Sequence, residues 1–197
     1  MLFKEEKLKK EMSECKLAVA TPSMGTIKTK TVESLIGMLK NFPHEYYFLS
    51  HEGSIIHHMR ERLVKKAIEL DCTHLLFVDS DMVFDKDAVL KLLERDKDII
   101  GVNCNRRKLP LESTAILDGS EAKDGLVKAI SVGTGFMLIK LSIFDYLPEP
   151  WFFWQSNQSG DLVTGEDYWF CSLARKHNFD VWCDLSVKIG HLGETIF

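Results

Sequence analysis

The sequence has no long apolar run, no excess of positive charge and no apolar segment at its start. Its apolar stretches fall short of the ~18 residues that a membrane-spanning helix needs, and the opening residues Met1-Leu2-Phe3-Lys4-Glu5-Glu6 lack the apolar core of a signal peptide. Lysine and arginine number 25 against 29 acidic residues, a net charge of −4, whereas a nucleic-acid surface needs a basic stripe. We therefore expect no membrane span, no nucleic-acid partner and a cytoplasmic protein that handles small anionic ligands.

The sequence also lacks any CxxC pair, which argues against a zinc site of that kind. The cysteines are odd in number and scattered, at Cys15, Cys72, Cys104, Cys171 and Cys183. This set is typical of reduced thiols in a reducing compartment.

What is present fits an ordinary globular chain. The apolar fraction is 45% and the charged fraction 27%, and 197 residues suffice for one domain with a sizeable core. No repeat or linker marks a boundary. We expect a single domain over 1–197, in which the Lys- and Glu-rich segment 1–14 is a solvated extension.

Strands and helices alternate in the predicted first half of the chain. Strands are expected at 17–20, 46–49, 75–78 and 99–102. Helical spacing of apolar residues predicts helices over 31–40, 54–70 and after Asp85, with Ser54 and Asp85 as N-caps. The first of these helices carries four apolar residues on one face, namely Val32, Leu35, Ile36 and Leu39.

The alternation favours an α/β fold with a mostly parallel, doubly wound sheet flanked by helices. The second half is less regular. It contains a predicted strand over 132–139, a long loop over 151–164, a helix over 164–176 and short strands at 181–183 and 187–189.

The strongest local motif is Asp79-Ser80-Asp81, which directly follows the apolar run 75–78. In an open parallel sheet, ligands bind beyond the carboxyl ends of the strands. Two carboxylates at such an end repel each other unless a cation offsets their charge, and Mg²⁺ and Mn²⁺ suit both carboxylates and diphosphate oxygens. The alternative is a surface turn in which Asp81 or Asp85 caps the next helix.

A second acidic motif, Gly165-Glu166-Asp167, opens the helix predicted over 164–176. A carboxylate there is a candidate general base for a hydroxyl proton. The alternative is a capping box formed by Thr164 and Asp167, because acids are also favoured in the first turn of a helix.

Two basic residues are further candidates. His191, in Gly190-His191-Leu192-Gly193, carries an imidazole that binds first-row divalent metals. Arg60 is able to clamp a phosphate or the Asp79 and Asp81 carboxylates. The alternatives are an ordinary core or surface histidine and a solvated arginine beside Glu61 and Arg62.

The segment Trp151-Phe152-Phe153-Trp154 precedes the predicted long loop. Aromatic faces stack on sugar rings, but at least two of the four are expected to pack in the core instead.

These motifs, in this order, resemble the GT-A fold glycosyltransferases of the family-2-like, DxD-containing kind. The resemblance runs from Leu17 to Gly193 and includes the Arg60 helix, the Asp79-Ser80-Asp81 strand end, Gly133-Thr134-Gly135, Gly165-Glu166-Asp167 and Gly190-His191-Leu192-Gly193. It implies a single GT-A type domain that moves a sugar from a UDP- or GDP-linked donor to an acceptor hydroxyl. The sequence departs from the family by having no evident acceptor-recognition domain.

The resemblance also implies residue roles. Thr21, Pro22 and Ser23 would line the nucleoside pocket, and Arg60 and Asp79-Ser80-Asp81 would hold the donor. Asp79, Asp81 and His191 would ligate Mn²⁺ or Mg²⁺. Asp167 would be the base of an inverting displacement, with Glu166 holding the acceptor hydroxyls.

Two alternatives to a glycosyltransferase stay open. Asp79-Ser80-Asp81-Met82-Val83 also matches the nucleophile motif of haloacid-dehalogenase-like phosphatases, although that family places it on the first strand. A non-catalytic subunit that binds nucleotide sugars is the other. The sequence does not specify the sugar, the base, the acceptor or the oligomeric state.

Overall fold

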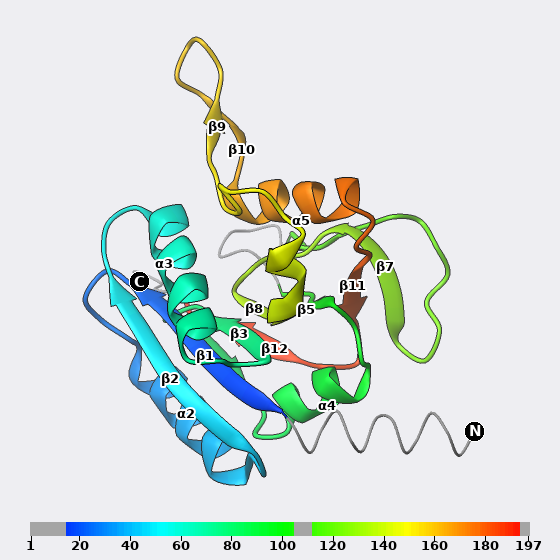
Figure 1. The fold of residues 1–197 in the computed structure, drawn as a ribbon. Helices are drawn as coiled ribbons and strands as arrows, with labels where there is room; N and C mark the ends of the chain where they lie inside the picture. Colours follow the sequence, from blue (N-terminus) through cyan, green and yellow to red (C-terminus); the bar gives the residue numbers. More distant parts are fainter. Residues whose placement is uncertain (1–14, 105–111, 194–197) are drawn as a thin grey trace, which may run out of the picture.

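The computed structural model describes residues 15–104 and 112–193, so the charged extension expected over 1–14 lies outside the described residues. An eight-stranded sheet forms its centre (Figure 1). In spatial order its strands are β2 (Glu45–Glu52), β1 (Lys16–Ser23), β3 (His74–Val78), β8 (Phe136–Lys140), β5 (Ile99–Val102), β11 (Val181–Asp184), β7 (Leu126–Ser131) and β6 (Ile116–Leu117).

The α/β fold predicted from the sequence, with a large central sheet flanked by helices, is confirmed, but the sheet is mixed, because three of its strand pairings are parallel and four are antiparallel. β2, β1 and β3 pair in parallel, as do β5 and β11. β8 is antiparallel to both β3 and β5, so those two strands keep a common direction although β8 separates them. β7 is the second reversed strand, antiparallel to β11.

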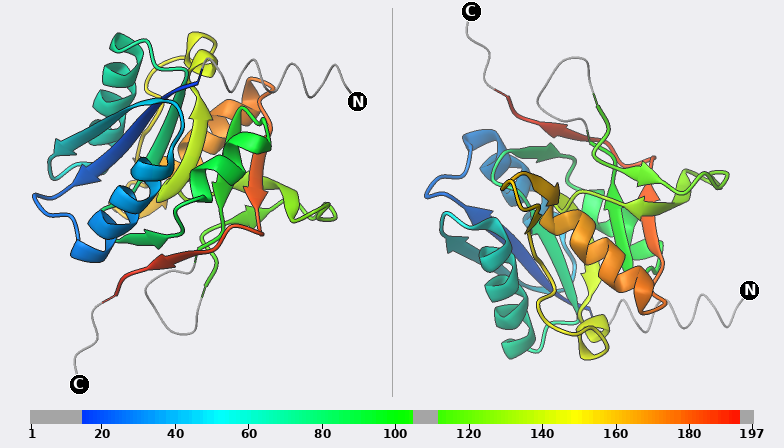
Figure 2. Two further views of the ribbon diagram at one scale, coloured as in Figure 1. Left: turned by 90° about the horizontal axis from the view of Figure 1, so that it is seen from below. Right: turned by 90° about the horizontal axis from the view of Figure 1, so that it is seen from above.

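Four α-helices among the described residues cover the two faces of the sheet, as the two views in Figure 2 show. Their bounds are α2 (Thr29–Asn41), α3 (Ile56–Glu69), α4 (Ala88–Glu94) and α5 (Glu166–Lys176). Alternate side chains of each strand point to opposite faces: Leu17 and Val19 pack with α2 and α4, whereas Ala18 and Ala20 pack with α3 and α5. Within the described chain, no helix is long and apolar enough to cross a membrane.

The short elements of the structure differ most from the prediction. β4 (Met82–Phe84) pairs with β12 (Ile189–His191), and a 3₁₀ helix spans Leu141–Asp145. The predicted loop over 151–164 contains a hairpin of β9 (Gln155–Ser156) and β10 (Leu162–Thr164), which projects from the body beyond α5 (Figure 1). The predicted strand over 132–139 begins at Phe136 instead, because a turn precedes it.

Both expected N-caps are wrong. α3 begins after Ile55 and α4 after Asp87, and no described side chain caps either helix. Asp85 lies two residues before the actual N-cap, Asp87, because a turn separates the end of β4 from α4. Ser54 precedes the actual N-cap position by one residue.

The apolar face of α2 is rotated from the predicted one. Thr31, Leu35 and Met38 are buried, whereas Val32 and Ile36 are 37% and 50% exposed. Helical spacing identifies the apolar side of a helix, but the sheet decides which part of that side it covers.

A buried carboxylate links β11 to the end of α4. The Asp184 side chain, at the end of β11, is fully buried and accepts a 2.6 Å hydrogen bond from Nε of Arg95, which follows α4. Arg95 also donates to the backbone oxygen of Asp124. Burial by itself would raise the pKa of Asp184, but the bonds from Arg95 and Ser186 outweigh it and lower that pKa.

Replacing Asp184 with Asn should destabilise the fold by about 2–4 kcal/mol, because it removes one partner of a largely buried pair. The Asp184 carboxylate stabilises the fold above its unfolded pKa of ~3.9 and stops doing so as the pH falls through its lower folded pKa. Urea unfolding should therefore show a difference between wild type and D184N at pH 7 that narrows in strong acid.

Asp180→Asn is the matched control, because Asp180 pairs with Lys128 at 2.6 Å on the surface. It should cost less than about 1 kcal/mol. Equal destabilisation by the two variants would contradict the role assigned to Asp184.

Candidate functional site

A cavity of about 110 Å³ lies where β3 ends, α5 begins and β12 passes. Five ionisable residues singled out from the sequence line it, namely Arg60, Asp79, Glu166, Asp167 and His191, as do Gly133, Thr134 and Gly135. Asp81 is not among the described lining residues. The lining residues are up to 131 positions apart along the chain, from 60 to 191. The fold therefore brings together side chains that are distant in the sequence.

Asp79-Ser80-Asp81 forms the turn between β3 and β4. The Asp79 N–H donates to the Gly135 carbonyl at 2.9 Å, and the Ser80 carbonyl accepts from the Lys28 N–H at 2.8 Å. Asp81 is only 9% exposed. These contacts fix the turn on both sides, so the two carboxylates are held and do not belong to a loose surface turn.

Gly135 allows this turn to approach the start of β8. A Cβ atom at this position would collide with Met82 and lie 3.2 Å from a carboxylate oxygen of Asp79. The glycine-rich bend therefore serves close packing against the acidic turn.

Arg60 is a buried cation, with a side chain only 2% exposed. Its Nη2 donates to Asp79 Oδ1 at 2.9 Å, and its Nε donates to Glu166 Oε1 at 3.4 Å. Its guanidinium also lies 5.1 Å from the centre of the Phe77 ring. The alternative of a solvated charge is wrong, because Arg60 lies on the face of α3 that packs on the sheet.

The third nitrogen of the guanidinium, Nη1, is buried and has no hydrogen-bond partner among the described residues. A buried unpaired donor on a cation is costly. The N–H groups of Nη1 are therefore unused among the described residues, on a cationic side chain that lines the cavity, and this suits an anionic ligand.

Glu166 is held through both of its carboxylate oxygens. Arg60 contacts Oε1, and the Trp154 indole N–H donates to Oε2 at 2.7 Å. The capping-box alternative is not realised, because Gly165 is the N-cap of α5 and receives no side-chain cap from the described residues. Glu166 thus faces the cavity as a fixed carboxylate.

The pKa of Asp167 is raised, first by burial of the carboxyl group and second by the negative charge of Glu166. The Tyr168 N–H, which donates to Asp167 Oδ1 at 2.7 Å, and the charge of Arg60 lower this pKa, but they do not cancel the increase. A carboxylate with a raised pKa is a better proton acceptor. Of the two acids, Asp167 therefore has the properties of a general base.

His191 reaches the acidic turn through the pairing of β12 with β4. Its Nε2 lies 3.3 Å from Asp81 Oδ1, and the Leu192 N–H donates to the Asp81 carbonyl at 2.8 Å. The backbone pairing sets His191 opposite Met82, so the imidazole is positioned by strand register and not by chance contact.

The donor chemistry of Asp81 and His191 fits a divalent cation that completes its shell with substrate oxygens. Mg²⁺ is commonly held by one or two carboxylates plus phosphates, and imidazole also suits Mn²⁺. Asp79 directs Oδ1 to Arg60, and the described residues contain no group of three or more His, Cys, Asp or Glu able to hold a metal ion by itself. A metal here would depend on the ligand that it binds.

Thr21, Pro22 and Ser23 end β1 beside the ends of β2 and β3. They are outside the described lining of the cavity. Thr21 is fully buried, and its hydroxyl has no partner among the described residues. A nucleoside pocket at this strand end stays a prediction.

The aromatic segment divides as expected. Trp151 and Phe152 are 6% and 0% exposed and belong to the core, whereas Phe153 and Trp154 are 40% and 43% exposed. Trp154 also lies 5.5 Å from the His57 ring. Its bond to Glu166 makes Trp154 a site residue that sequence reasoning did not assign, because nothing in the local pattern links it to a residue twelve positions later.

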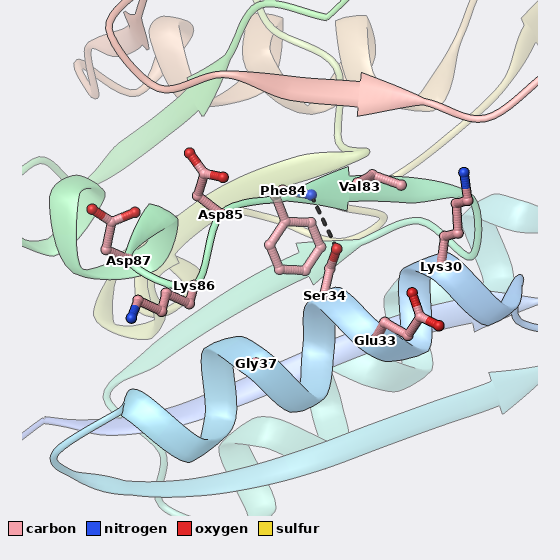
Figure 3. Close-up of a pocket in the computed structure, with 9 residues that line it drawn as sticks. All are labelled: Lys30, Glu33, Ser34, Gly37, Val83, Phe84, Asp85, Lys86 and Asp87. Atoms are coloured by element: carbon pink, nitrogen blue, oxygen red, sulfur yellow. Dashed lines mark hydrogen bonds between the residues drawn. The ribbon is translucent and has the colours of Figure 1, made fainter.

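A second hollow, of about 540 Å³, lies between α2 and the turn from β4 to α4 (Figure 3). Its charged lining mixes Lys30 and Lys86 with Glu33, Asp85 and Asp87. None of the residues predicted for the site lines it, and its mixed charges fit a solvated groove better than a binding site for one charged group.

No protein-family model and no curated protein sequence matches the chain. Solved structures do resemble it. The A197 protein from STIV is 23% identical and superposes with a TM-score of 0.63 over 91% of this chain and 86% of that one.

UDP-glucose pyrophosphorylase complexed with UDP-glucose is 8% identical and superposes with a TM-score of 0.53 over 89% of this chain and 92% of that one. At these identities the likeness concerns the fold. The chain therefore has the α/β fold, with a large central sheet between helices, that is also found in an enzyme of nucleotide sugars.

Proposed function

We propose that this chain is a glycosyltransferase that moves a sugar from a nucleotide-diphosphate sugar to an acceptor hydroxyl. The observation that carries the proposal is the single cavity in which Arg60, Asp79, Glu166, Asp167 and His191 meet at the carboxyl ends of the strands. That edge of an open α/β sheet is where ligands bind, and the fold likeness to a structure complexed with UDP-glucose agrees with it.

The donor would bind at the turn Asp79-Ser80-Asp81, with its nucleoside toward Thr21, Pro22 and Ser23. Asp81 and His191 would hold Mn²⁺ or Mg²⁺, and Asp79 stands beside them as the third proposed ligand. When bound, such an ion would neutralise charge on the departing diphosphate. The unpaired Nη1 of Arg60 supports the same assignment, because it is a buried, positively charged group that is able to bind the diphosphate of the sugar nucleotide.

The acids on α5 would act on the acceptor. Asp167 would take the hydroxyl proton while the acceptor oxygen bonds to the anomeric carbon and the bond from that carbon to the diphosphate breaks, which inverts the configuration. Glu166, fixed by Arg60 and Trp154, would hold the acceptor hydroxyls in line.

The structure is less favourable to the two alternatives. In a haloacid-dehalogenase-like phosphatase the Asp79 motif ends the first strand, whereas here β1 and β2 precede β3. A module that only binds nucleotide sugars would not need a carboxylate with a raised pKa beside the cavity, as Asp167 is.

Thermal shift with a panel of UDP-, GDP- and dTDP-sugars, with and without Mn²⁺, tests the donor site. One sugar nucleotide should stabilise the protein in a metal-dependent way, and Asp81→Ala should weaken this binding by about tenfold or more because a metal ligand is lost.

Asp85→Ala is the matched control, since Asp85 is an exposed carboxylate on the neighbouring groove, whereas Asp81 contacts His191. It should bind the donor like wild type. The donor assignment would be wrong if Asp81→Ala showed the same metal-dependent thermal shift as wild type, or if no sugar nucleotide stabilised the protein. Release of pyrophosphate from a nucleoside triphosphate and a sugar phosphate would instead indicate nucleotidyl transfer.

Asp167→Asn should lower sugar transfer by about 10²–10⁴-fold and leave metal-dependent donor binding intact. Because the pKa of Asp167 is raised, wild-type transfer should fall with decreasing pH at a pH above the ordinary Asp pKa of ~3.9.

Glu166→Gln serves as the comparison, because it keeps the size of the side chain but removes its charge and one of the two oxygens that accept hydrogen bonds from Arg60 and Trp154. It should raise the KM for the acceptor more than it lowers kcat. The acidic limb of the pH profile should persist but move to lower pH, because the charge of Glu166 that helps to raise the pKa of Asp167 is gone. If Asp167→Asn transfers sugar at the wild-type rate, Asp167 is not the base.

A further inference from the structure

β2 forms one edge of the central sheet. It pairs with β1 on one side, and among the described residues no strand pairs with its other side. The strand is eight residues long, Glu45 to Glu52, and contains neither lysine nor proline. Long edge strands without such residues are prone to pair with another strand, because their outward N–H and C=O groups remain available.

An apolar surface borders this edge on the α2 face of the sheet. We call it the edge patch; it consists of Val32, Ile36, Tyr46 and Phe48, which are 37%, 50%, 42% and 41% exposed. On β2, Tyr46 contacts the ring of Phe42, a core residue beneath α2, and Phe48 shares its face by strand alternation.

The two helical members of the patch point toward β2. Ser34 Oγ accepts a hydrogen bond from the Phe84 N–H, so this side of α2 faces β4 (Figure 3). Val32 and Ile36 are each two residues from Ser34, and therefore lie about 200° around the helix from it. This explains why they are exposed although they belong to the apolar side predicted from the sequence.

The β2 sequence is complementary to itself in one antiparallel register. In a symmetric pair, a residue lies opposite a residue whose side chain is on the same face of the sheet. With Phe48 opposite Phe48, Glu45 faces His51, Tyr47 faces Leu49 and Tyr46 faces Ser50, and the next position brings His44 opposite Glu52. Each carboxylate thus meets an imidazole, which is able to donate a hydrogen bond to it.

Neighbouring registers lose this match. Centring the pair on Leu49 places Tyr46 opposite Glu52, and centring it on Tyr47 places Glu45 opposite Leu49. Both put a carboxylate against an apolar or aromatic side chain, which is unfavourable.

We propose that two copies of this chain associate through β2, antiparallel and centred on Phe48, to form one continuous sheet across a two-fold axis. The edge patches of the two copies flank that axis on one face, which is the self-complementary arrangement of a symmetric dimer. No residue of β2 is among the described lining of the candidate site, so both cavities stay open in the dimer.

Cysteine cross-linking tests the register. In Phe48→Cys the two introduced thiols lie opposite each other at the axis, where facing Cβ atoms are ~4.5–5.5 Å apart, near the distance of a disulfide. Mild oxidation should give a covalent dimer on a non-reducing gel. The native cysteines should not interfere, because all five are buried.

Tyr46→Cys is the matched control, on the same strand and face and equally exposed. In the proposed register Tyr46 lies opposite Ser50, so its two copies are separated by four residues along the strand, ~13 Å. It should form little disulfide. Equal cross-linking of both variants, or of neither, would overturn the register.

Light scattering during gel filtration tests the association without cysteines. Wild type should elute at twice the chain mass at tens of micromolar, and Phe48→Lys should be monomeric because two ammonium groups would meet at the axis. Ile68→Lys, at an exposed apolar residue on α3, should stay dimeric. A monomeric wild type would reject the proposal.

Exchanging Glu45 and His51 tests whether the dimer depends on specific strand pairing or only on apolar contact. His51→Glu should weaken the dimer at least several-fold, because it places a second carboxylate opposite Glu45 of the other copy. Adding Glu45→His to His51→Glu restores an imidazole opposite each carboxylate and should restore the dimer. Failure of the double variant to recover, with its fold intact by circular dichroism, would count against this register.

Discussion

The buried guanidinium of Arg60 is the contact on which the candidate site depends. It joins three elements, because α3 carries it, β3 ends at its partner Asp79, and α5 begins with its partner Glu166. Two carboxylates near one cavity would repel each other, and taking them out of water adds a desolvation cost. The fully charged, planar guanidinium of Arg60 offsets both the repulsion and the desolvation cost, and it holds the two carboxylates at fixed positions. The start of α5 is therefore held to the acidic turn by an ion pair and not by apolar packing alone.

This arrangement separates the properties of the two neighbouring acids. Glu166 is held by Arg60 and Trp154, so its oxygens are engaged. Asp167 is partly buried beside the charge of Glu166, and its pKa is raised. Environment alone thus distinguishes adjacent carboxylates on one helix turn. The same guanidinium also limits the effect on Asp167, because its positive charge lowers the pKa of that group. Removing the charge of Arg60 would therefore change both the position of α5 and the acidity of the proposed base.

The sequence predicted the strands and helices whose signal is local. The apolar run that became β3, the acidic turn after it and the helix that begins at Glu166 are continuous patterns, and the structure places them as expected. Local sequence patterns could not predict β4, β9 and β10, because these strands are two or three residues long and depend on pairing with other segments. Ser54 and Asp85 were wrong as caps because α3 and α4 begin one and two residues later than these positions predicted, after Ile55 and Asp87. The link from Trp154 to Glu166 and the buried position of Arg60 likewise depend on the folded chain.

The reversed strand β8 explains why motifs so far apart meet. It enters the sheet between β3 and β5 and runs against both, so its beginning lies beside their carboxyl ends. The bend at Gly135 therefore lies next to Asp79, and the absence of a Cβ atom at Gly135 leaves room for the Asp79 carboxylate. On the other side of the turn, β12 returns the end of the described chain to β4 and sets His191 beside Asp81. Since both approaches are made by backbone pairing, a change of one residue in either register would turn these side chains to the opposite face. The geometry of the candidate site is thus a property of strand register.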